Sequence, residues 1–498
     1  MSKRILIFTL ALGIVMSLAM SGIAFADQAT PVTLTVLTQY YTGNVGPQQF
    51  PKVNQMMLEI AKQYEQLHPN VTIKFIPWTF TGANGQTTFE TWLVSQFAAG
   101  TEPDISWEQC SNTWIQPGYW MPLNSYLETP NPYAPAGDGQ KEWKNCLPDF
   151  VWSAVAAPNG DYYTLATDWI ETGLFYNKAI FDKLGLSPNF TSWDQFMQTL
   201  KTLKEHGYIG LGLYMSNSQW SVYQWLDDIV TTACFADKVP QMYMPKYSEL
   251  YKQQTYDGEE WRVLTPEEIA KAIYDGLYST DSPEFVEFLN IIKELSQYFP
   301  NGFTSNIDTT ALFYSGKEAM LWSTSGQVPL LNSSQPPFQW GITYLPPFST
   351  QQIPQLPKMF QNVSFRVGGP TATGQFNIST GAVKSGVASW AVDFLKYLST
   401  PNTMGKVINE EGADIPMIKG TPMATSLVFF KTVASYPVRA FMDPIGRFTP
   451  TYTTEYDTVI ENYLTGTIDM QTAQKEIQSI FDNFAKSMAL EYHYSWYK

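Results

Sequence analysis

Hydrophobic positions in the first part of the chain alternate between two periods. Val32 to Thr38 alternates in polarity and is rich in β-branched side chains, as in a half-buried strand. Apolar residues between 53 and 67 then recur at helical spacing, so they share one face of a helix. Residues 71–76, 88–99 and 104–107 continue as strand, helix and strand. This alternation predicts a mostly parallel sheet covered by helices.

Three later stretches repeat the helical period. Apolar residues recur at intervals of three and four between 285 and 292, between 390 and 398, and across the last 45 residues. The regions 131–139 and 336–357 interrupt this rhythm with Pro, Gly and Gln, and we expect them at the surface. The whole pattern predicts an α/β protein.

The composition narrows the possible classes. With 498 residues and 44% hydrophobic content, the chain can bury a large core and is long enough for two domains. Lys and Arg number 30 against 45 Asp and Glu, and the net charge of −15 disfavours binding to nucleic acid. Charged residues make up 15% of the chain, below the roughly 25% of ordinary domains, whereas aromatic residues also reach 15%. This balance favours aromatic recognition of an uncharged ligand.

The scarcity of basic residues also predicts tolerance of acid. Protonation of carboxylates removes negative charge in acid, while the few Lys and Arg side chains keep positive self-repulsion small. We therefore expect the protein to keep its thermal stability between about pH 6 and pH 4.

The amino terminus has the pattern of a secretory signal. Lys3 and Arg4 precede an apolar run, and Ala24-Phe25-Ala26 provides the small residues of a cleavage site. We expect residues 1–26 to be a signal peptide and the protein to be extracytoplasmic, in the periplasm or on the outer cell surface. The alternative is an uncleaved membrane anchor, because this apolar stretch could just span a bilayer.

The sequence contains no strong catalytic or metal-binding motif. Its 3 histidines have no zinc-binding spacing, and neither a G-x-S-x-G elbow nor a phosphate-binding loop is present. We therefore expect no metal and no cofactor. A glycoside hydrolase that uses a pair of carboxylates stays an alternative function. The candidate pairs are Asp168 with Glu171, or Asp227 with Asp228. The 3 cysteines allow either a Cys110–Cys146 bridge or three buried thiols.

The region from Tyr162 to Phe196 reads YYTLATDWIETGLFYNKAIFDKLGLSPNFTSWDQF. It resembles the extracellular solute-binding proteins of ABC importers, specifically the sugar-binding family that includes maltose-binding protein. Further matches follow the family's order: EQLHPNVTIKF from Glu65, FAAGTEPDI from Phe97, GKEAMLW from Gly316, WAVDFLKYLSTPN from Trp390, and, more weakly, GADIPMIKG from Gly412. The resemblance covers Glu65 to about Gly420.

The resemblance implies two α/β lobes, each a mostly parallel sheet flanked by helices, with a hinge between them. The first lobe would take residues 27–165 and 370–420, and the second would take residues 167–366 and 424–498. Ala166-Thr167-Asp168 and Val367-Gly368-Gly369 are then the hinge candidates. The chain is longer than typical members, and we place the surplus mainly in 131–147, 236–262 and 333–360.

The resemblance further implies a non-enzymatic, monomeric binding protein that closes on a sugar and is read by the transmembrane permease subunits of an importer. A peptide or polyol ligand stays an alternative. A sugar site needs aromatic platforms and planar polar groups. Trp107 is the leading candidate because it follows the PDIS motif, Asp168 lies at the lobe crossing, and Trp322 follows GKEAM. The other candidates near predicted strand ends or in the second lobe are Gln39, Tyr40, Tyr41, Trp78, Glu108, Trp169, Glu171, Trp220, Trp225, Ser323 and Thr324.

Overall fold

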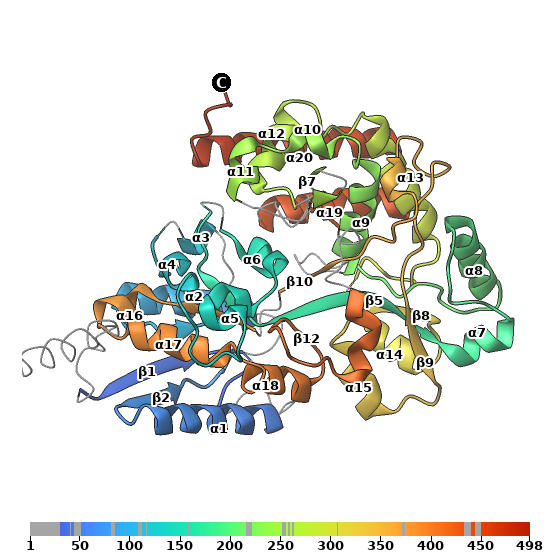
Figure 1. Cartoon of the computed structure of the whole chain (residues 1–498). Coiled ribbons are helices and arrows are strands. Elements are labelled where there is room, and N and C mark those ends of the chain that lie inside the picture. The colour runs from blue at the N-terminus through green and yellow to red at the C-terminus, as the bar shows by residue number, and fades with distance from the viewer. Residues whose placement is uncertain are drawn as a thin grey trace, which may run out of the picture.

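The protein is a two-lobed α/β structure in which the chain passes from β4 (Thr164–Ala166) of the first sheet directly into the long strand β5 (Asp168–Asn177) of the second (Figure 1). This computed structural model describes residues 30–39, 41–43, 51–80, 85–107, 112–115, 117–157, 160–215, 222–250, 255–256, 259–260, 263–305, 307–370, 374–432, 440–443 and 450–498. The expected signal peptide lies outside these residues. Within them, no helix has both the length and the apolar character needed to cross a membrane.

The first sheet has five strands in the order β2-β1-β3-β11-β4. Its strands are β1 (Val32–Leu37), β2 (Val71–Phe75), β3 (Ile105–Ser106), β4 (Thr164–Ala166) and β11 (Gln375–Ile378). β1 pairs in parallel with β2 and β3, whereas β11 is antiparallel to both β3 and β4. Four strands therefore run in one direction, and the predicted mostly parallel sheet is confirmed for this lobe.

Helices cover the first sheet as the apolar spacing predicts. On α1 (Pro51–Leu67), Val53, Met57, Ile60 and Tyr64 are buried, whereas Leu67 at the helix end is 57% exposed, contrary to the predicted face. The other helices of this lobe are α2 (Gly85–Ala99), α3 (Asn112–Ile115), α4 (Asn124–Leu127), α5 (Asp138–Lys141), η1 (Trp143–Cys146), α6 (Asp149–Val155), α16 (Thr380–Lys384), α17 (Ala388–Leu398) and α18 (Met404–Glu411).

The second sheet is built around β5 (Asp168–Asn177). Its partners, all antiparallel to it, are β8 (Met320–Thr324), β9 (Trp340–Thr343), β10 (Gly368–Pro370) and β12 (Ile415–Pro416). The prediction of a mostly parallel sheet is therefore wrong for the pairing in this lobe, because its central strand enters from the first lobe and runs against every strand it pairs with. Among the residues of this lobe that the structure describes, parallel pairing is limited to isolated bridges at Ile209 and Gly212.

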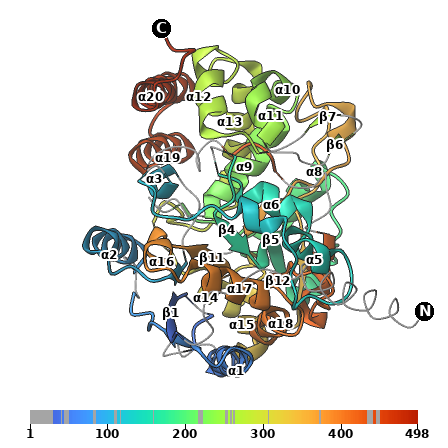
Figure 2. The ribbon, with the colours of Figure 1, turned by 60° about the vertical axis from the view of Figure 1, so that its left-hand side comes forward.

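The core of the second lobe is mainly helical, and Figure 2 shows α19 and α20 at the end of the molecule far from α1. Ser192 caps α8 by accepting a hydrogen bond from the Gln195 amide, as the TSWDQF motif indicates. The elements here are α7 (Lys178–Leu184), α8 (Trp193–Glu205), α9 (Val222–Cys234), α10 (Val239–Met242), α11 (Pro245–Leu250), the hairpin β6 (Thr255–Tyr256) and β7 (Glu259–Glu260), α12 (Pro266–Tyr274), α13 (Pro283–Ser296), α14 (Thr309–Tyr314), α15 (Gln327–Ser334), η2 (Lys358–Phe360), η3 (Thr425–Thr432), α19 (Pro450–Thr465) and α20 (Met470–Glu491).

Three chain crossings meet at Thr167, the residue between β4 and β5. The Thr167 amide donates to the Gly374 carbonyl at 2.9 Å, just before β11. The Thr167 carbonyl accepts from the Met417 amide at 2.9 Å, just after β12. The next residue, Asp168, lies opposite Pro416 in the β5–β12 ladder. The predicted hinge segment 166–168 is thus where all three connections touch; its motion stays a prediction.

Candidate functional site

The carboxyl ends of the strands in the two sheets face the same region of the molecule. β1, β2, β3 and β4 run in one direction, so their ends share one edge, and Tyr41, Trp78 and Trp107 follow three of them. β8 and β9 run against β5, so their carboxyl ends point back toward the start of β5 and the first sheet. Ligands of open α/β sheets bind outside such strand ends.

An aromatic cluster occupies the edge of the first sheet. Trp107 is 1% exposed, and its ring lies 5.5 Å from Trp78 and 5.0 Å from Phe89 between centroids. The Trp78 indole donates to the Phe80 carbonyl at 2.7 Å. The Trp107 indole N–H is buried and has no hydrogen-bond partner among the described residues. The leading sequence candidate therefore lies at the expected edge with an unused donor.

Tyr41 and Asp168 bind each other at the crossing. The Tyr41 hydroxyl donates to Asp168 Oδ2 at 2.7 Å, and both side chains are fully buried. Burial raises the pKa of Tyr41 well above its usual value, and the nearby Asp168 carboxylate raises it further. A side chain at Gly374 would collide with the Asp168 carboxylate. The contacts that the structure gives these two candidates are structural and hold the crossing together.

A small pocket lies beside β5 and β8 of the second sheet. Trp322, on β8, lines it together with Thr172 of β5, Tyr344 and Arg366. Trp225 of α9 lies beside it, with its ring 6.4 Å from that of Trp322. The remaining lining residues are Gly173, Leu174, Ile229, Leu345 and Phe365.

Arg366 and Tyr344 were missed by the sequence reasoning. The guanidinium carbon of Arg366 lies 3.5 Å from the centroid of the Tyr344 ring, and a guanidinium nitrogen lies 3.6 Å from Glu171 Oε1. The signal was available, because an arginine directly precedes the Val367-Gly368-Gly369 hinge candidate in a chain poor in basic residues.

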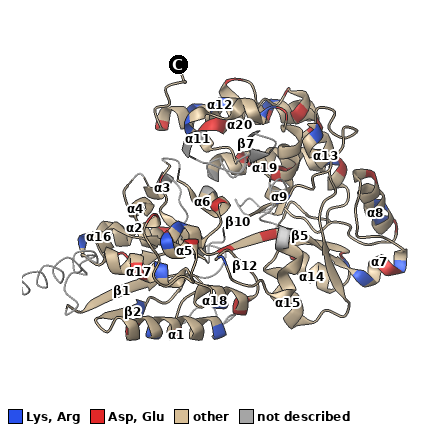
Figure 3. Cartoon of the chain, in the orientation of Figure 1, with Lys and Arg blue, Asp and Glu red and all other residues tan. Residues whose placement is uncertain are grey.

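The environment of Glu171 disfavours its charge. Its side chain is fully buried on β5, where Figure 3 shows acidic positions between the lobes. Burial raises the pKa of Glu171 to about 8, although the Arg366 guanidinium opposes that shift. The carboxyl of Glu411 is affected in the same way beside the crossing, where burial raises its pKa to about 7.

The first nominated carboxylate pair does not have the geometry of a glycosidase. Asp168 and Glu171 are three residues apart on one strand, so their side chains point to opposite faces of the sheet. Asp227 is fully buried and accepts hydrogen bonds from Thr231 and Tyr456, both at 2.8 Å. Within the described residues, the hydrogen bonds of Asp168 and Asp227 are made with other groups of the fold.

Of the remaining candidates, the structure describes some and leaves others outside the described residues. Trp169 is buried in the hydrophobic core against Phe150, with ring centroids 5.2 Å apart. The Ser323 hydroxyl lies 3.3 Å from Gln327 Oε1, at the carboxyl end of β8. The candidates Tyr40, Glu108 and Trp220 lie outside the described residues.

The sequence also led to expectations about cysteine pairing and metal binding. Cys146 and Cys234 are buried free thiols, so the suggested bridge from Cys110 to Cys146 is not formed. Cys110 itself lies outside the described residues. Across the described ranges, no group of three or more His, Cys, Asp or Glu side chains could hold a metal ion.

Comparison with known proteins gives the same architecture. The family model for bacterial extracellular solute-binding proteins matches residues 50–404. A curated relative from Brucella abortus (strain 2308), named only as a binding protein, is 24% identical over 220 residues, which are 42% of this chain and 45% of the relative. The match thus spans less than half of that relative.

Solved structures agree over nearly the whole chain. The apo form of RafE from Streptococcus pneumoniae has a TM-score of 0.59 and 17% identity, covering 93% of this chain and 100% of RafE. An ABC substrate-binding protein from Listeria monocytogenes has a TM-score of 0.57 and 15% identity, covering 92% of this chain and 99% of the other. At these identities the likeness is one of fold, and it confirms the expected two-lobed α/β architecture.

Proposed function

Because the chain belongs to the family of bacterial extracellular solute-binding proteins, we propose that it captures a carbohydrate between its two lobes and delivers it to the permease of an ABC importer. A ligand that contacts both lobes stabilises the closed state through contacts the open state lacks. The permease then distinguishes the closed shape from the open one. No bond in the sugar is made or broken, so the protein acts as a carrier.

The single observation that carries this proposal is the pair of facing strand edges. Trp78 and Trp107 lie just after strands of the first sheet, and Trp322 lies on β8 of the second sheet with Trp225 of α9 beside it. Indole rings match the apolar C–H faces of sugars, and neighbouring polar groups can bind hydroxyls. Ligand contact by these residues is part of the proposal.

The ligands of proteins with the same fold further support a sugar as the class of ligand. RafE has been solved in complex with raffinose, and the Listeria protein in complex with cycloalternan. Another similar structure is a chitin oligosaccharide binding protein, with a TM-score of 0.61. These ligands differ in size and linkage, so they define the starting panel for this chain and leave its preferred sugar to experiment.

The test is a binding panel with product analysis. The mature protein is titrated by calorimetry and thermal shift with raffinose, chitotriose, maltotriose, xylotriose, galactose and tagatose, and with a polyol and a peptide as other ligand classes. A sugar present at 100 times its Kd adds about 2.7 kcal/mol to the stability of the folded state. We expect at least one sugar to raise the melting temperature and to be recovered intact. Released products, or binding limited to the polyol or peptide, would contradict the proposal.

Location and assembly follow from the same proposal. The family is extracellular, and we propose that residues 1–26 direct export and that the exported protein works as a monomer. Amino-terminal sequencing of the secreted protein distinguishes a cleaved signal from a retained anchor, and light scattering gives the assembly state.

A further inference from the structure

A polar cluster, which we call the Asp393 cluster, lies at the amino ends of the parallel strands of the first sheet, opposite the edge that Trp107 follows. Its members are Tyr64 of α1, His68 between α1 and β2, Tyr133 of the 131–139 region and Asp393 of α17. Tyr64 is fully buried, whereas the side chains of His68 and Asp393 are 18% and 14% exposed. The members come from three distant segments, so no sequence spacing could reveal them as a group.

The four side chains meet at one carboxylate oxygen. The hydroxyls of Tyr64 and Tyr133 both donate to Asp393 Oδ2, at 2.8 and 2.6 Å. His68 Nε2 lies 2.7 Å from the Tyr133 oxygen and 3.5 Å from Asp393 Oδ2. Because the Tyr133 proton is used toward Asp393, the imidazole N–H is the donor in its contact with Tyr133. Three oxygen atoms and one nitrogen atom, all of which can bind a metal, therefore face one another.

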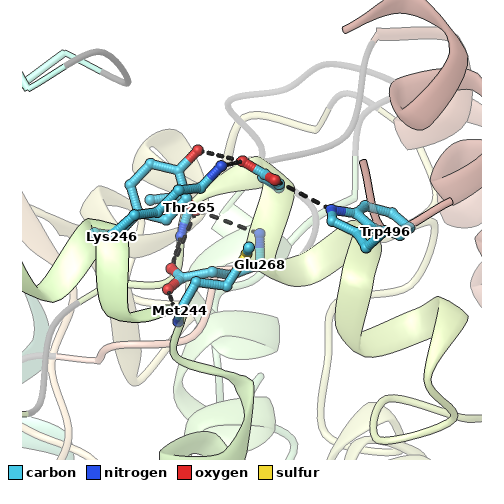
Figure 4. Close-up of polar contacts among 7 residues, drawn as sticks. Met244, Lys246, Thr265, Glu268 and Trp496 are labelled. Atoms are coloured by element: carbon cyan, nitrogen blue, oxygen red, sulfur yellow. Dashed lines mark hydrogen bonds and ion pairs between the residues drawn. The ribbon is translucent and has the colours of Figure 1, made fainter. Parts of the chain in front are cut away.

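Another carboxylate of the protein has similar aromatic donors and is neutralised by a cation of the chain. Glu267 accepts hydrogen bonds from the Tyr247 hydroxyl at 2.6 Å and from the Trp496 indole at 3.1 Å. The Lys246 ammonium pairs with the same carboxylate (Figure 4). In this second-lobe cluster the chain itself supplies the cation that a buried carboxylate attracts.

The Asp393 cluster lacks such a pairing with a basic side chain. Among the residues that the structure describes, Asp393 forms no ion pair with a Lys or an Arg, and its charged contact is with His68. Lys396, on the same helix, donates instead to the Thr129 hydroxyl at 2.7 Å and to the Pro130 carbonyl at 2.8 Å. The cluster thus combines a carboxylate, two phenols and an imidazole without a bound ammonium or guanidinium.

The spacing and the charge of the donor atoms match a small trivalent cation. A cation held octahedrally by bonds of about 2.0–2.1 Å keeps adjacent ligand atoms about 2.9 Å apart, which is close to three of the four separations in the cluster. Two phenolates and one carboxylate carry three negative charges, so a 3+ ion forms a neutral complex in a site largely shielded from water. Phenolate, carboxylate and imidazole are all ligands of ferric iron.

We propose that the Asp393 cluster binds a ferric ion, at a site separate from the sugar site. The ion takes the place of the two phenol protons, which leave to solvent, and the imidazole N–H moves from Nε2 to Nδ1 so that Nε2 can coordinate. No oxidation or reduction is involved. Burial raises the pKa of Tyr64 and Tyr133 above the usual value, and Asp393 raises it further, so both phenols keep their protons until a highly charged cation displaces them.

The first experiment titrates the untagged mature protein with ferric nitrilotriacetate. Phenolate coordination gives ferric iron a visible charge-transfer absorption that the free chelate lacks. We expect this absorption to saturate at one ion per chain, the iron to stay with the protein through desalting, and the melting temperature to rise. Zn²⁺ in about tenfold excess should leave the absorption unchanged, because a 2+ ion would leave a net negative charge in the shielded site.

Tyr64→Phe and Tyr133→Phe each remove one phenolate ligand. Loss of an outer-shell partner alone costs about 10–100-fold in metal affinity, so loss of a ligand should weaken iron binding at least about 100-fold and lower the visible absorption. The matched control is Tyr397→Phe. The Tyr397 ring lies 5.2 Å from that of Tyr133, but its hydroxyl contacts Gln63 at 3.4 Å and not the cluster. The control should bind iron as wild type does.

Three results would overturn this inference. They are a wild-type protein that neither develops the absorption nor retains iron, displacement of the iron by Zn²⁺, and iron binding in Tyr64→Phe and Tyr133→Phe equal to that in Tyr397→Phe. The first result needs no variant, so it stands even where a substitution impairs folding. Sugar affinity, measured on the same proteins, should be unchanged in Tyr133→Phe, because the cluster lies opposite the edge that Trp107 follows. Failure of iron binding leaves the proposed function standing, and failure of the sugar panel leaves the ferric site standing.

Discussion

The Tyr41 hydroxyl donates a 2.7 Å hydrogen bond to the Asp168 carboxylate, and this buried contact joins the loop after β1 to the strand that leaves the first lobe. Asp168 also lies opposite Pro416, at the connection that follows β12. Its carboxylate fills the space beside Gly374, at the connection that precedes β11. Asp168 thus lies where all three connections between the lobes meet, and its carboxylate is bonded to Tyr41 of the first lobe.

Tyr41→Phe removes this hydrogen bond and leaves Asp168 buried without its phenol partner. Because the acceptor is a buried carboxylate, we expect the free energy of unfolding to fall by about 1.5–3 kcal/mol. Urea denaturation measures the change. Tyr397→Phe is the control, since its hydroxyl makes only a 3.4 Å exposed contact with Gln63. Equal effects of the two substitutions would contradict the role given to the Tyr41–Asp168 bond.

Trp107→Phe separates ligand contact from packing. Phenylalanine keeps most of the aromatic contact with Trp78 and Phe89 but removes the indole N–H that lacks a partner among the described residues. We expect sugar affinity to fall about tenfold, measured by calorimetry, with a modest loss of stability. Trp143→Phe is the control, because Trp143 is buried and its indole donates to the Ser399 hydroxyl at 2.9 Å. It should lose stability while sugar affinity is unchanged; the reverse pattern would rule out Trp107 as a ligand contact.

Buried carboxyl groups predict greater stability in mild acid. Burial raises the pKa of Asp227 to about 7 and that of Asp457 to about 8, as it does for Glu171 and Glu411. In the unfolded chain these groups titrate near pH 4, so between about pH 4 and pH 8 the folded state binds more protons. Their contribution to stability is fully present below about pH 4 and is lost as the pH rises through 7 to 8.

The measurement is the melting temperature at pH 8, 6.5 and 5 at constant ionic strength. We expect the midpoint to rise by several degrees from pH 8 to pH 5. Asp457→Asn should reduce this slope, since it removes one of the titrating groups. A midpoint that collapses between pH 6 and pH 4 would contradict both this prediction and the acid tolerance expected from the composition.

The close approach of Gly212 to Glu318 predicts that a side chain added at position 212 destabilises the second lobe. A Cβ atom at position 212 would collide with the Glu318 carboxyl, whose two oxygens are buried and have no hydrogen-bond partner among the described residues. Burial raises the pKa of Glu318 well above its usual value, which favours the neutral form of the carboxyl. Gly212→Ala should lower stability by about 1–3 kcal/mol through overpacking. Glu318→Ala in the same chain should restore part of that loss in urea denaturation, and additive effects would contradict the contact.

Local patterns predicted the regular elements well because their causes lie within a few residues. The period of the apolar side chains placed α1, α13 and α17 correctly, and the predicted helix 88–99 is confirmed as α2, with Gly100 at the left-handed φ of +68° expected at its end. Leu67 shows where this reasoning stops, since it continues the apolar spacing but is exposed to solvent. Spacing defines a helix face, whereas burial depends on what covers that face.

The sequence by itself determined the α/β class, the order of elements and the family, because periodicity, caps and motifs are local properties of the chain. The tertiary structure alone decided which polar groups meet. Tyr41 and Asp168 are 127 positions apart in sequence, and Arg366 reaches Glu171 only because β10 returns to pair with β5. The antiparallel pairing of β5 was decided in the same way. The charge of a buried carboxyl depends on such distant partners and on its exclusion from water, and both arise when the chain folds.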